Sequence, residues 1–304
     1  MNQNPRTSYK GIYFMLLAAA AFAVMSGFAK VLKPHYDAAQ LVFFRNMVGL
    51  LALLPSFLIK PVKQSGGRFG LLLFRGIMGS FALYTLLFNI LHLTIGAAMT
   101  YNSINTFYIA LIGGWFLKEK LNSISWVCIV LGFIGVLLIY RPDIDFNWQY
   151  HAIGLLHGLF SAMAYLSIGS LNKYYDTRII VLSFLVSGIV LPLLGMCIGA
   201  TGWVATDHFF FPEFPTISSD SLWYLAGMGI SALLGQYFVT LAYSNDKAGI
   251  VAAIGYSNIV FGLMVGIVLG DPNPGWIASI GILLVILSGV ILSLFKNKMP
   301  EKKE

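Results

Sequence analysis

The chain has 304 residues, of which 58% are hydrophobic and only 10% are charged. A soluble globular domain is about 45–50% apolar and about 25% charged, so this composition excludes a soluble protein and indicates an integral membrane protein. The net charge of +7 does not indicate nucleic-acid binding, because the basic residues lie in short loops and the tail, without interleaved aromatic residues.

Ten apolar runs cover most of the chain. The first run is as long as a full membrane span, about 20 residues, and longer than the core of a signal peptide, about 7–15 residues. The connections are short and contain the Pro, Gly and Asp residues of turns. We therefore expect an all-α integral membrane protein with ten transmembrane helices, at about residues 11–32, 39–59, 69–90, 97–117, 122–140, 151–171, 179–200, 221–243, 248–269 and 276–295.

Lys and Arg are distributed unevenly between the two sides of this topology. With a cytoplasmic N-terminus, 14 of the 19 basic residues lie in cytoplasmic segments and 3 lie on the opposite side, while Arg45 and Arg75 fall inside spans. Cytoplasmic loops of membrane proteins carry such an excess. We expect a multi-pass protein of the cell inner membrane with both termini in the cytoplasm.

The fourth span contains a cluster of polar side chains between apolar ends. Polar groups in hydrocarbon are costly unless they face protein, water or a ligand, so the cluster indicates an internal cavity. Helical spacing places Tyr101, Asn105 and Tyr108 on one face and Asn102 and Thr106 on an adjacent stripe. These five residues are candidate substrate-binding residues. The alternative is that they form hydrogen bonds between helices.

The two halves of the sequence resemble each other weakly. Tyr36-Asp37 aligns with Tyr175-Asp176 at an offset of 139 residues, and Ser103–Thr106 aligns with Gly255–Asn258 at an offset of 152 residues. We expect a five-helix repeat over residues 1–145, a second over residues 146–298 and a cytoplasmic tail over residues 299–304. Because five is odd, the repeats have inverted orientations, and such proteins bind substrates where the repeats meet, near the membrane midplane.

Further candidate substrate-binding residues lie in the spans that correspond to each other in this alignment. Tyr84 lies in the third span, and Gln236 and Tyr237 lie in the eighth. Tyr256 and Asn258 of the ninth span mirror the cluster of the fourth. All five could hydrogen-bond a ligand or hold helices together.

Two arginines lie inside spans without a carboxylate in the same span. A buried guanidinium needs a partner, so Arg45 and Arg75 indicate a substrate with an anionic group. The alternative is that both side chains extend to the cytoplasmic interface. Arg45, six or seven residues in from the outer end of its span, is the candidate substrate-binding residue of the two, whereas Arg75 fits the alternative better.

Every acidic residue lies in a loop or at a helix end, which disfavours proton coupling through a carboxylate within the membrane. His157, about a third of the way into the sixth span, is the candidate for proton coupling, because the ordinary pKa of histidine is about 6.5. A neutral histidine that is hydrogen-bonded to a neighbouring helix is the alternative.

Several short stretches together resemble the drug/metabolite transporter superfamily in its ten-helix, EamA-like branch. They are Leu41–Arg45 in the second span, Phe74–Gly76 in the third, and Gly96–Ala98 and Phe116–Leu121 at the ends of the fourth. The family often has Pro in the middle of the fourth span, where this chain has Asn105-Thr106. The resemblance implies secondary transport of a small metabolite across the inner membrane, often outward, by rocking of two inverted halves.

We therefore expect a secondary transporter that moves a small anionic or zwitterionic metabolite by alternating access, through export or exchange. A flippase for a lipid-linked intermediate is the alternative, and it would need an apolar lateral opening with Arg45 at the lipid headgroup. An enzyme is disfavoured because clustered carboxylates or histidines for metal, acid or base chemistry are lacking in the sequence. The expected partners are the substrate and the lipid bilayer, without a metal, cofactor or nucleic acid; a homodimer is left open.

Overall fold

The computed structural model describes residues 9–62, 64–92, 95–116, 122–140, 148–203, 211–270, 273 and 275–295. These residues form helices and no β-strand, as the hydropathy predicts. The α-helices are α1 (Lys10–Leu32), α2 (Ala38–Leu53), α3 (Pro55–Ile59), α4 (Phe69–His92), α5 (Ile95–Phe116), α6 (Ser123–Tyr140), α7 (Trp148–Leu171), α8 (Thr177–Ala200), α9 (Leu222–Asn245), α10 (Ala248–Ile254), α11 (Ser257–Val268) and α12 (Trp276–Phe295), and a short 3₁₀ helix, η1, covers Ser219–Ser221.

Helices occupy every predicted span. Seven helical segments of the described chain are long and apolar enough to cross a membrane, and two shorter apolar helices cover Ser123–Ile139 and Trp276–Ile291. The number of ten crossings remains a prediction. Residues 117–121 at the end of the fourth span and the tail over residues 299–304 lie outside the described residues.

Two predicted spans are divided. The second divides into α2 and α3 at Pro55, because proline lacks the N–H that a continuous helix needs. The ninth divides into α10 and α11 at Gly255 and Tyr256. There Asn258 N donates to Gly255 O at 3.0 Å, so the chain makes a tighter turn of the 3₁₀ type between the two helices.

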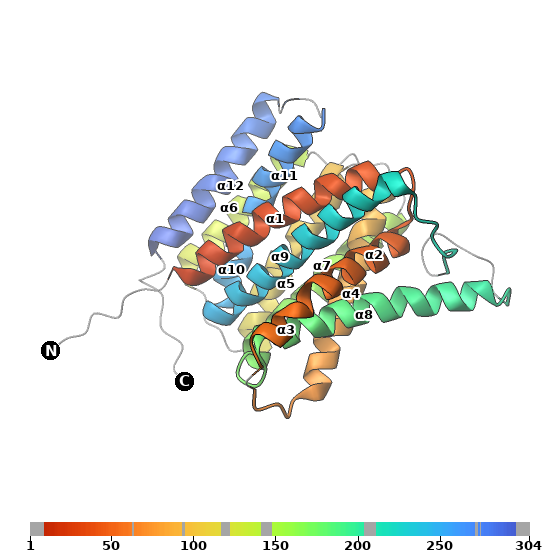
Figure 1. Ribbon diagram of the computed structural model, residues 1–304. Coiled ribbons are helices and arrows are strands. Elements are labelled where there is room, and N and C mark those ends of the chain that lie inside the picture. The colour runs from red at the N-terminus through yellow and green to blue at the C-terminus, as the bar shows by residue number, and fades with distance from the viewer. Residues whose placement is uncertain are drawn as a thin grey trace.

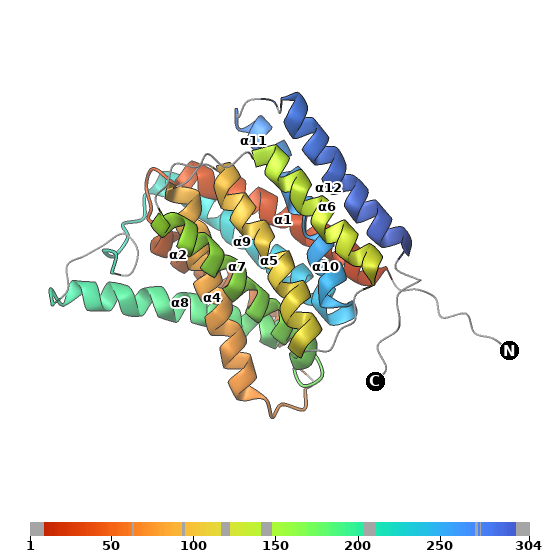
Figure 2. The same ribbon diagram turned by 180° about the vertical axis from the view of Figure 1, so that it is seen from behind.

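The helices pack in pairs that recur in a regular order (Figures 1 and 2). α1 lies along α9 and α4 lies along α7; α5 packs against α7 and α11 packs against α1; α4 packs against α8 and α2 packs against α9. α2 also contacts α8, and α6 contacts α12. α1 begins and α12 ends at the same end of the bundle.

The α6–α12 pair lies at one edge of the molecule (Figure 2) and depends on two glycines. A Cβ atom on Gly135 would lie 2.6 Å from the carbonyl oxygen of Gly281, and one on Gly281 would lie 2.5 Å from that of Gly135. Glycine at both positions therefore lets the two backbones touch, as small residues do at membrane helix crossings.

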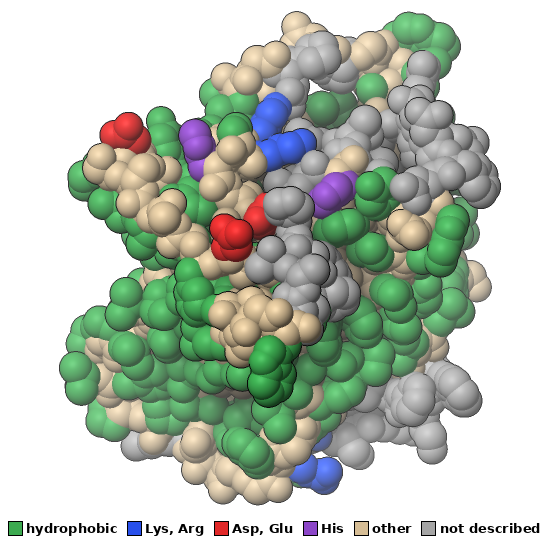
Figure 3. Space-filling view, turned by 90° about the vertical axis from the view of Figure 1, so that its right-hand side faces the viewer, with side chains coloured by type: hydrophobic (Ala, Val, Ile, Leu, Met, Phe, Trp, Pro, Cys, Tyr) green, Lys and Arg blue, Asp and Glu red, His purple; other side chains and the backbone are tan. Residues whose placement is uncertain are grey.

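The outside of the protein is apolar, and its interior combines apolar clusters with buried polar side chains. Large apolar side chains such as Leu58, Trp223 and Val268 are more than four-fifths exposed, whereas Arg45, Arg75 and many amide and hydroxyl side chains are buried. In Figure 3, hydrophobic side chains cover much of the face, while acidic, histidine and some basic side chains lie in its upper part and further basic side chains lie at the bottom. An apolar exterior with the polar side chains of the spans buried inside is what a lipid environment requires.

Candidate functional site

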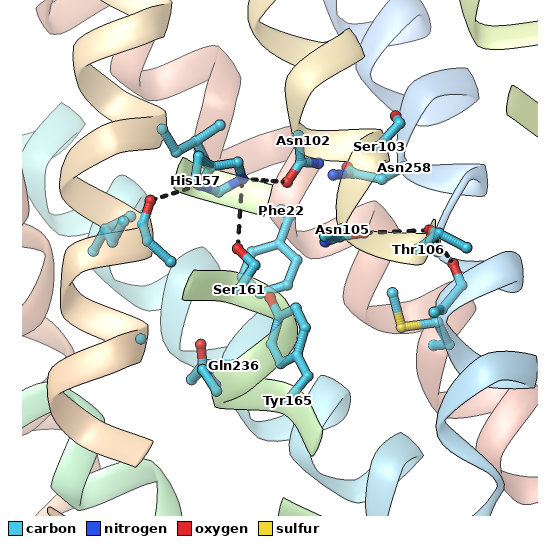
Figure 4. A pocket seen from close by; sticks show the side chains of 18 of the residues that line it. Phe22, Asn102, Ser103, Asn105, Thr106, His157, Ser161, Tyr165, Gln236 and Asn258 are labelled. Atoms are coloured by element: carbon cyan, nitrogen blue, oxygen red, sulfur yellow. Dashed lines mark hydrogen bonds between the residues drawn. The ribbon is translucent and has the colours of Figure 1, made fainter. Parts of the chain in front are cut away.

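A polar cavity of about 100 Å³ lies between the helices of the bundle (Figure 4). Its lining comes from α1, α2, α4 and α5 of the first predicted repeat and from α7, α8, α9, α10 and α11 of the second. Most of the predicted site residues meet in this lining, although they are far apart in the sequence: Arg45, Asn102, Asn105, Thr106, His157, Gln236, Tyr256 and Asn258.

The structure brings part of the α5 cluster to the cavity. Asn102, Ser103, Asn105 and Thr106 line it, whereas the candidates Tyr101 and Tyr108 are not part of the lining. The two tyrosines lie on the neighbouring face, toward α7, because Gly154 and Gly158 of α7 leave space for their rings. The Tyr101 hydroxyl forms a hydrogen bond with His151 Nδ1.

Two further tyrosines that we expected at the site lie elsewhere. Tyr84 is buried in an apolar cluster with Leu83 and Leu87. Tyr237 lines a separate hollow that also contains Lys60 and Arg178. Each points away from the cavity because its position on the helix faces a different neighbour, which the sequence pattern did not reveal.

Thr106 and Tyr256 hold elements of the two predicted repeats together at the edge of the cavity. Thr106 Oγ1 lies 3.2 Å from both the Asn105 Oδ1 and the Ala252 carbonyl oxygen. The Tyr256 hydroxyl donates to the carbonyl oxygen of Ile129 at 3.3 Å. Both hydroxyls thus have acceptors within the protein, and the helix-to-helix bonding that we considered from the sequence is realised at these two residues.

His157 is 2% exposed and connects α7 to α4 and α5. Its Nδ1 lies 2.7 Å from the Ala82 carbonyl oxygen, and its Nε2 lies 3.0 Å from Asn102 Oδ1 (Figure 4). A carbonyl oxygen can only accept, so Nδ1 carries a proton. A second proton on Nε2 lets the ring donate to Asn102 Oδ1. In a neutral ring Nε2 is an acceptor, either for the Ser161 hydroxyl at 3.5 Å or for the amide NH₂ of Asn102 if that side chain turns. The charge of His157 therefore decides which bonds Asn102 and Ser161 make with it.

Arg45 and Arg75 approach the cavity beside the same aromatic ring. The guanidinium carbon of each lies 5.2 Å from the centroid of Phe184, within the range of a cation–π contact. Arg45 also donates to Asn46 Oδ1 at 2.9 Å and to Met25 Sδ at 3.3 Å. No Asp or Glu of the described residues lines the cavity.

Arg75 is 1% exposed, and its Nε and Nη1 have no hydrogen-bond partner among the described residues. Its guanidinium lies over Gly79, one turn further along α4 and away from the Phe69 end of the helix. A Cβ atom on Gly79 would lie 2.6 Å from Phe184 Cδ2, so glycine leaves room for the ring beside the guanidinium. The expectation that Arg75 extends to the membrane interface was wrong.

Known proteins resemble this chain over nearly its full length. An uncharacterized transporter of Helicobacter pylori is 33% identical over 288 residues, which cover 93% of this chain and 94% of that protein. The sequence pattern of the EamA-like transporter family matches residues 9–141. The chain belongs to the EamA-like transporter family.

Two more distant relatives of this EamA-like transporter carry functional names. The pseudopaline exporter CntI of Pseudomonas aeruginosa is 29% identical over 94% of this chain and 97% of its own. An S-adenosylmethionine uptake transporter of Rickettsia conorii is 22% identical over 100% of this chain and 99% of its own. A solved crystal structure matches 96% of this chain with a TM-score of 0.79 at 12% identity, which shows a shared fold.

These relatives identify the EamA-like transporter as a multi-pass membrane protein that belongs to the drug/metabolite transporter superfamily. The names of the two relatives state different substrates and opposite directions of transport, export in one and uptake in the other.

Other residues of the cavity were not among those predicted from the sequence. Ser161 and Tyr165 of α7 line it together with His157. The three are four residues apart, so the polar periodicity of the sixth span was a signal that could have found them. Phe22, Met25 and Ser26 of α1 also line the cavity, but their span shows no such periodicity.

Proposed function

We propose that this EamA-like transporter is a secondary transporter that moves a small anionic or zwitterionic metabolite across the inner membrane by alternating access, in export or exchange. The observation that carries the proposal is Arg75, a buried arginine at a central cavity with two unpartnered nitrogens. A charge removed from water is costly unless a partner compensates it. An anionic group of a substrate would supply that partner.

The packing of the helices supports two inverted halves, over residues 1–145 and 146–298. If α1, α2–α3, α4, α5 and α6 correspond in order to α7, α8, α9, α10–α11 and α12, the contact of α1 with α9 mirrors that of α4 with α7. The contact of α5 with α7 likewise mirrors that of α11 with α1, and the contact of α4 with α8 mirrors that of α2 with α9. The family match over residues 9–141 falls within the first half.

The proposed substrate site comprises the predicted residues that meet at the cavity, except Thr106 and Tyr256, whose hydroxyls bond between helices, together with Arg75. Arg45 and Arg75 would bind the anionic group, and Asn102, Asn105, Gln236 and Asn258 would bind neutral polar groups. His157 is the proposed proton-coupling residue, since its protonation changes what Asn102 can offer to a ligand. Because α1 begins and α12 ends at one end of the bundle, we also propose that both termini lie in the cytoplasm.

The alternative of a flippase has less support. An apolar hollow lies between α1, α10, α11 and α12, lined by residues such as Leu16, Phe261 and Val290. Arg45, which we expected at the headgroup of a lipid, lines the central cavity and is not part of this hollow.

The test is solute exchange in proteoliposomes with labelled organic acids and amino acids, loaded inside or outside the vesicles to determine the direction. We expect at least one such solute to exchange, and Arg75→Gln to reduce its rate at least tenfold, roughly the value of a charge-assisted hydrogen bond. Arg68→Gln is the matched control, because Arg68 stacks over Tyr174 outside the cavity. Equal rates for the wild type and Arg75→Gln would overturn the role of Arg75, and the absence of exchange for all these solutes would overturn the transport proposal.

A further inference from the structure

We propose that the substrate carries two acidic groups and no ammonium group, with one acid bound by Arg75 and the other by Arg45. The proposal rests on the proposed function and narrows it, because the sequence left anionic and zwitterionic substrates equally open.

The two guanidinium groups form one cationic side of the cavity. Arg75 and Arg45 are 1% and 3% exposed, and each lies 5.2 Å from the ring of Phe184. Neither has a carboxylate partner among the described residues, unlike Arg178, which pairs with Asp176. A substrate with a single acid would compensate one of the two buried charges and leave the other, whereas a diacid compensates both.

A zwitterion fits this cavity poorly. Its ammonium group would add a third positive charge to a site without a described carboxylate, and like charges in a medium of low dielectric constant repel strongly. The ring of Phe184, which could hold an ammonium group by a cation–π contact, already faces both guanidinium groups.

The two arginines should contribute unequally. Arg45 has Asn46 Oδ1 and Met25 Sδ as partners before any ligand binds, whereas the Nε and Nη1 of Arg75 have none. A hydrogen bond gained by a group that has no partner in the empty protein contributes more than one that replaces an existing bond. Arg75 should therefore set the affinity for an acid, and Arg45 should set the preference for a second acid.

The test is thermal stabilisation of the purified protein by matched probes: dicarboxylates of three to six carbons, butyrate as the monoacid and γ-aminobutyrate as the zwitterion. We expect at least one dicarboxylate to raise the unfolding midpoint, and butyrate and γ-aminobutyrate to have no effect at the same concentration. In Arg45→Gln the dicarboxylate should lose its advantage over butyrate, while in Arg75→Gln no acid should stabilise the protein.

Stabilisation by γ-aminobutyrate equal to that by the best dicarboxylate would overturn the diacid proposal, and so would a series in which no dicarboxylate stabilises the protein. The solute exchange described above separates this failure from that of the proposed function. Exchange of amino acids without exchange of diacids would leave a transporter with a different substrate class.

A second inference comes from the two turns that begin with Tyr-Asp. Asp37 caps the N-terminus of α2 and Asp176 caps that of α8. In both turns a residue in the first turn of the new helix reaches the backbone of the other proposed half. Gln40 Nε2 donates to Glu213 O at 3.1 Å, and Arg178 Nη1 donates to the carbonyl oxygens of Ser56 and Lys60 at 2.7 Å each.

The tyrosines of the two turns bond across the same boundary. The Tyr36 hydroxyl donates to Thr216 O at 3.3 Å, and the Tyr175 hydroxyl accepts from the backbone N–H of Arg68 at 3.3 Å. Lys10 lies at the end of α1 that we propose to be cytoplasmic. The turn between α1 and α2 lies at the other end of α1 and therefore at the opposite face of the membrane. The geometry points to a pair of latches, one at each face of the membrane, that both hold in this structure and open in turn during transport.

The two latches differ in strength. The bonds of Arg178 to Ser56 and Lys60 across the boundary come from a charged donor, whose guanidinium both oxygens of Asp176 hold in place, and charge-assisted bonds are roughly twice as strong as the neutral bonds of Gln40 and Tyr36. The latch at Gln40 should therefore open more readily than the latch at Arg178.

The test uses a cysteine in the cavity, Ser161→Cys in a chain without Cys128 and Cys197, and a membrane-impermeant maleimide applied to membrane vesicles of either orientation. Gln40→Ala should increase labelling from the side of the α1–α2 turn, and Arg178→Ala or the milder Arg178→Lys from the opposite side. An increase on the same side for both variants, or no change in folded protein, would overturn the pair of latches.

Discussion

The cavity side of α4 and the start of α8 each bury an arginine, yet the two side chains differ in how many hydrogen bonds they make. Arg178 is 8% exposed and bonds Asp176 and the carbonyl oxygens of Ser56 and Lys60. Arg75 is 1% exposed, and two of its nitrogens have no partner among the described residues. A buried charge whose bonds are complete stabilises the fold, whereas one with open positions at a cavity is available to a ligand.

The sharpest test of this comparison is Arg75→Met. The apolar side chain removes the buried charge, so the protein without substrate should become more stable by about 1–3 kcal/mol. Exchange of the transported solute should fall at least about tenfold. Thermal unfolding and proteoliposome exchange measure the two effects. A variant that loses stability would place Arg75 with Arg178 among the structural arginines.

Arg178→Met should have the opposite effect on stability. It leaves the carbonyl oxygens of Ser56 and Lys60 without their donor and Asp176 without its ion pair, at a cost of about 1–3 kcal/mol. Binding of the substrate, measured by thermal shift or calorimetry on the folded fraction, should weaken less than in Arg75→Met, because Arg178 does not line the cavity and its loss affects only the proposed latch. A larger loss of affinity than in Arg75→Met would reverse the comparison.

Gly79→Ala tests the space beside Arg75. The new Cβ would collide with Phe184 and with the guanidinium, so both must move and substrate affinity should fall several-fold. Gly70→Ala on the same helix is the matched control, because nothing lies within 4 Å of its Cβ position. That control should be neutral or stabilise the helix by up to about 1 kcal/mol. Equal affinities for the two variants would count against the proposed role of Arg75.

Thr106→Val tests a polar group of the cavity whose bonds are complete. The change removes the contacts of the hydroxyl with Asn105 and Ala252, and hydrogen bonds between membrane helices contribute about 1 kcal/mol or less. We expect a small loss in the unfolding midpoint and an exchange rate within about twofold of the wild type. A tenfold loss of exchange would move Thr106 from helix packing to the substrate site.

The smallest expected effect is on the stability of the protein at low pH. Partial burial raises the pKa of Asp176, but hydrogen bonds from Arg178 outweigh it and hold that pKa below its usual value of about 3.9. A carboxyl group with a lowered pKa stabilises the fold above the pKa of the unfolded chain, and this stability is lost as the pH falls through the folded value. Below about pH 4 the wild type should therefore lose more stability than Asp176→Asn. Parallel losses would show that the pair contributes nothing.

The sequence by itself determined the helices and their order. Runs of about 20 apolar residues form helices in a membrane, and proline and glycine marked the connections, although the division of the second span at Pro55 was not predicted. The sequence also determined that polar groups lie at depth in α5, α7 and α9. Polar groups have a high free-energy cost in hydrocarbon, so their presence implied a cavity. The residues that do meet there include Arg45, Asn102, Asn105, His157 and Gln236.

Only the tertiary structure decided which polar groups face that cavity. Helical spacing places Tyr101 and Asn102 next to each other. In the structure the rings of Tyr101 and Tyr108 pack against glycines of α7, whereas Asn102 and Asn105 line the cavity. Arg75 could have reached the interface along its own helix, but it lies over Gly79 and beside Phe184 of another helix. The sequence determines the angular position of a side chain on its helix, and the neighbour that packs against that face decides whether its polar atoms are bonded or open.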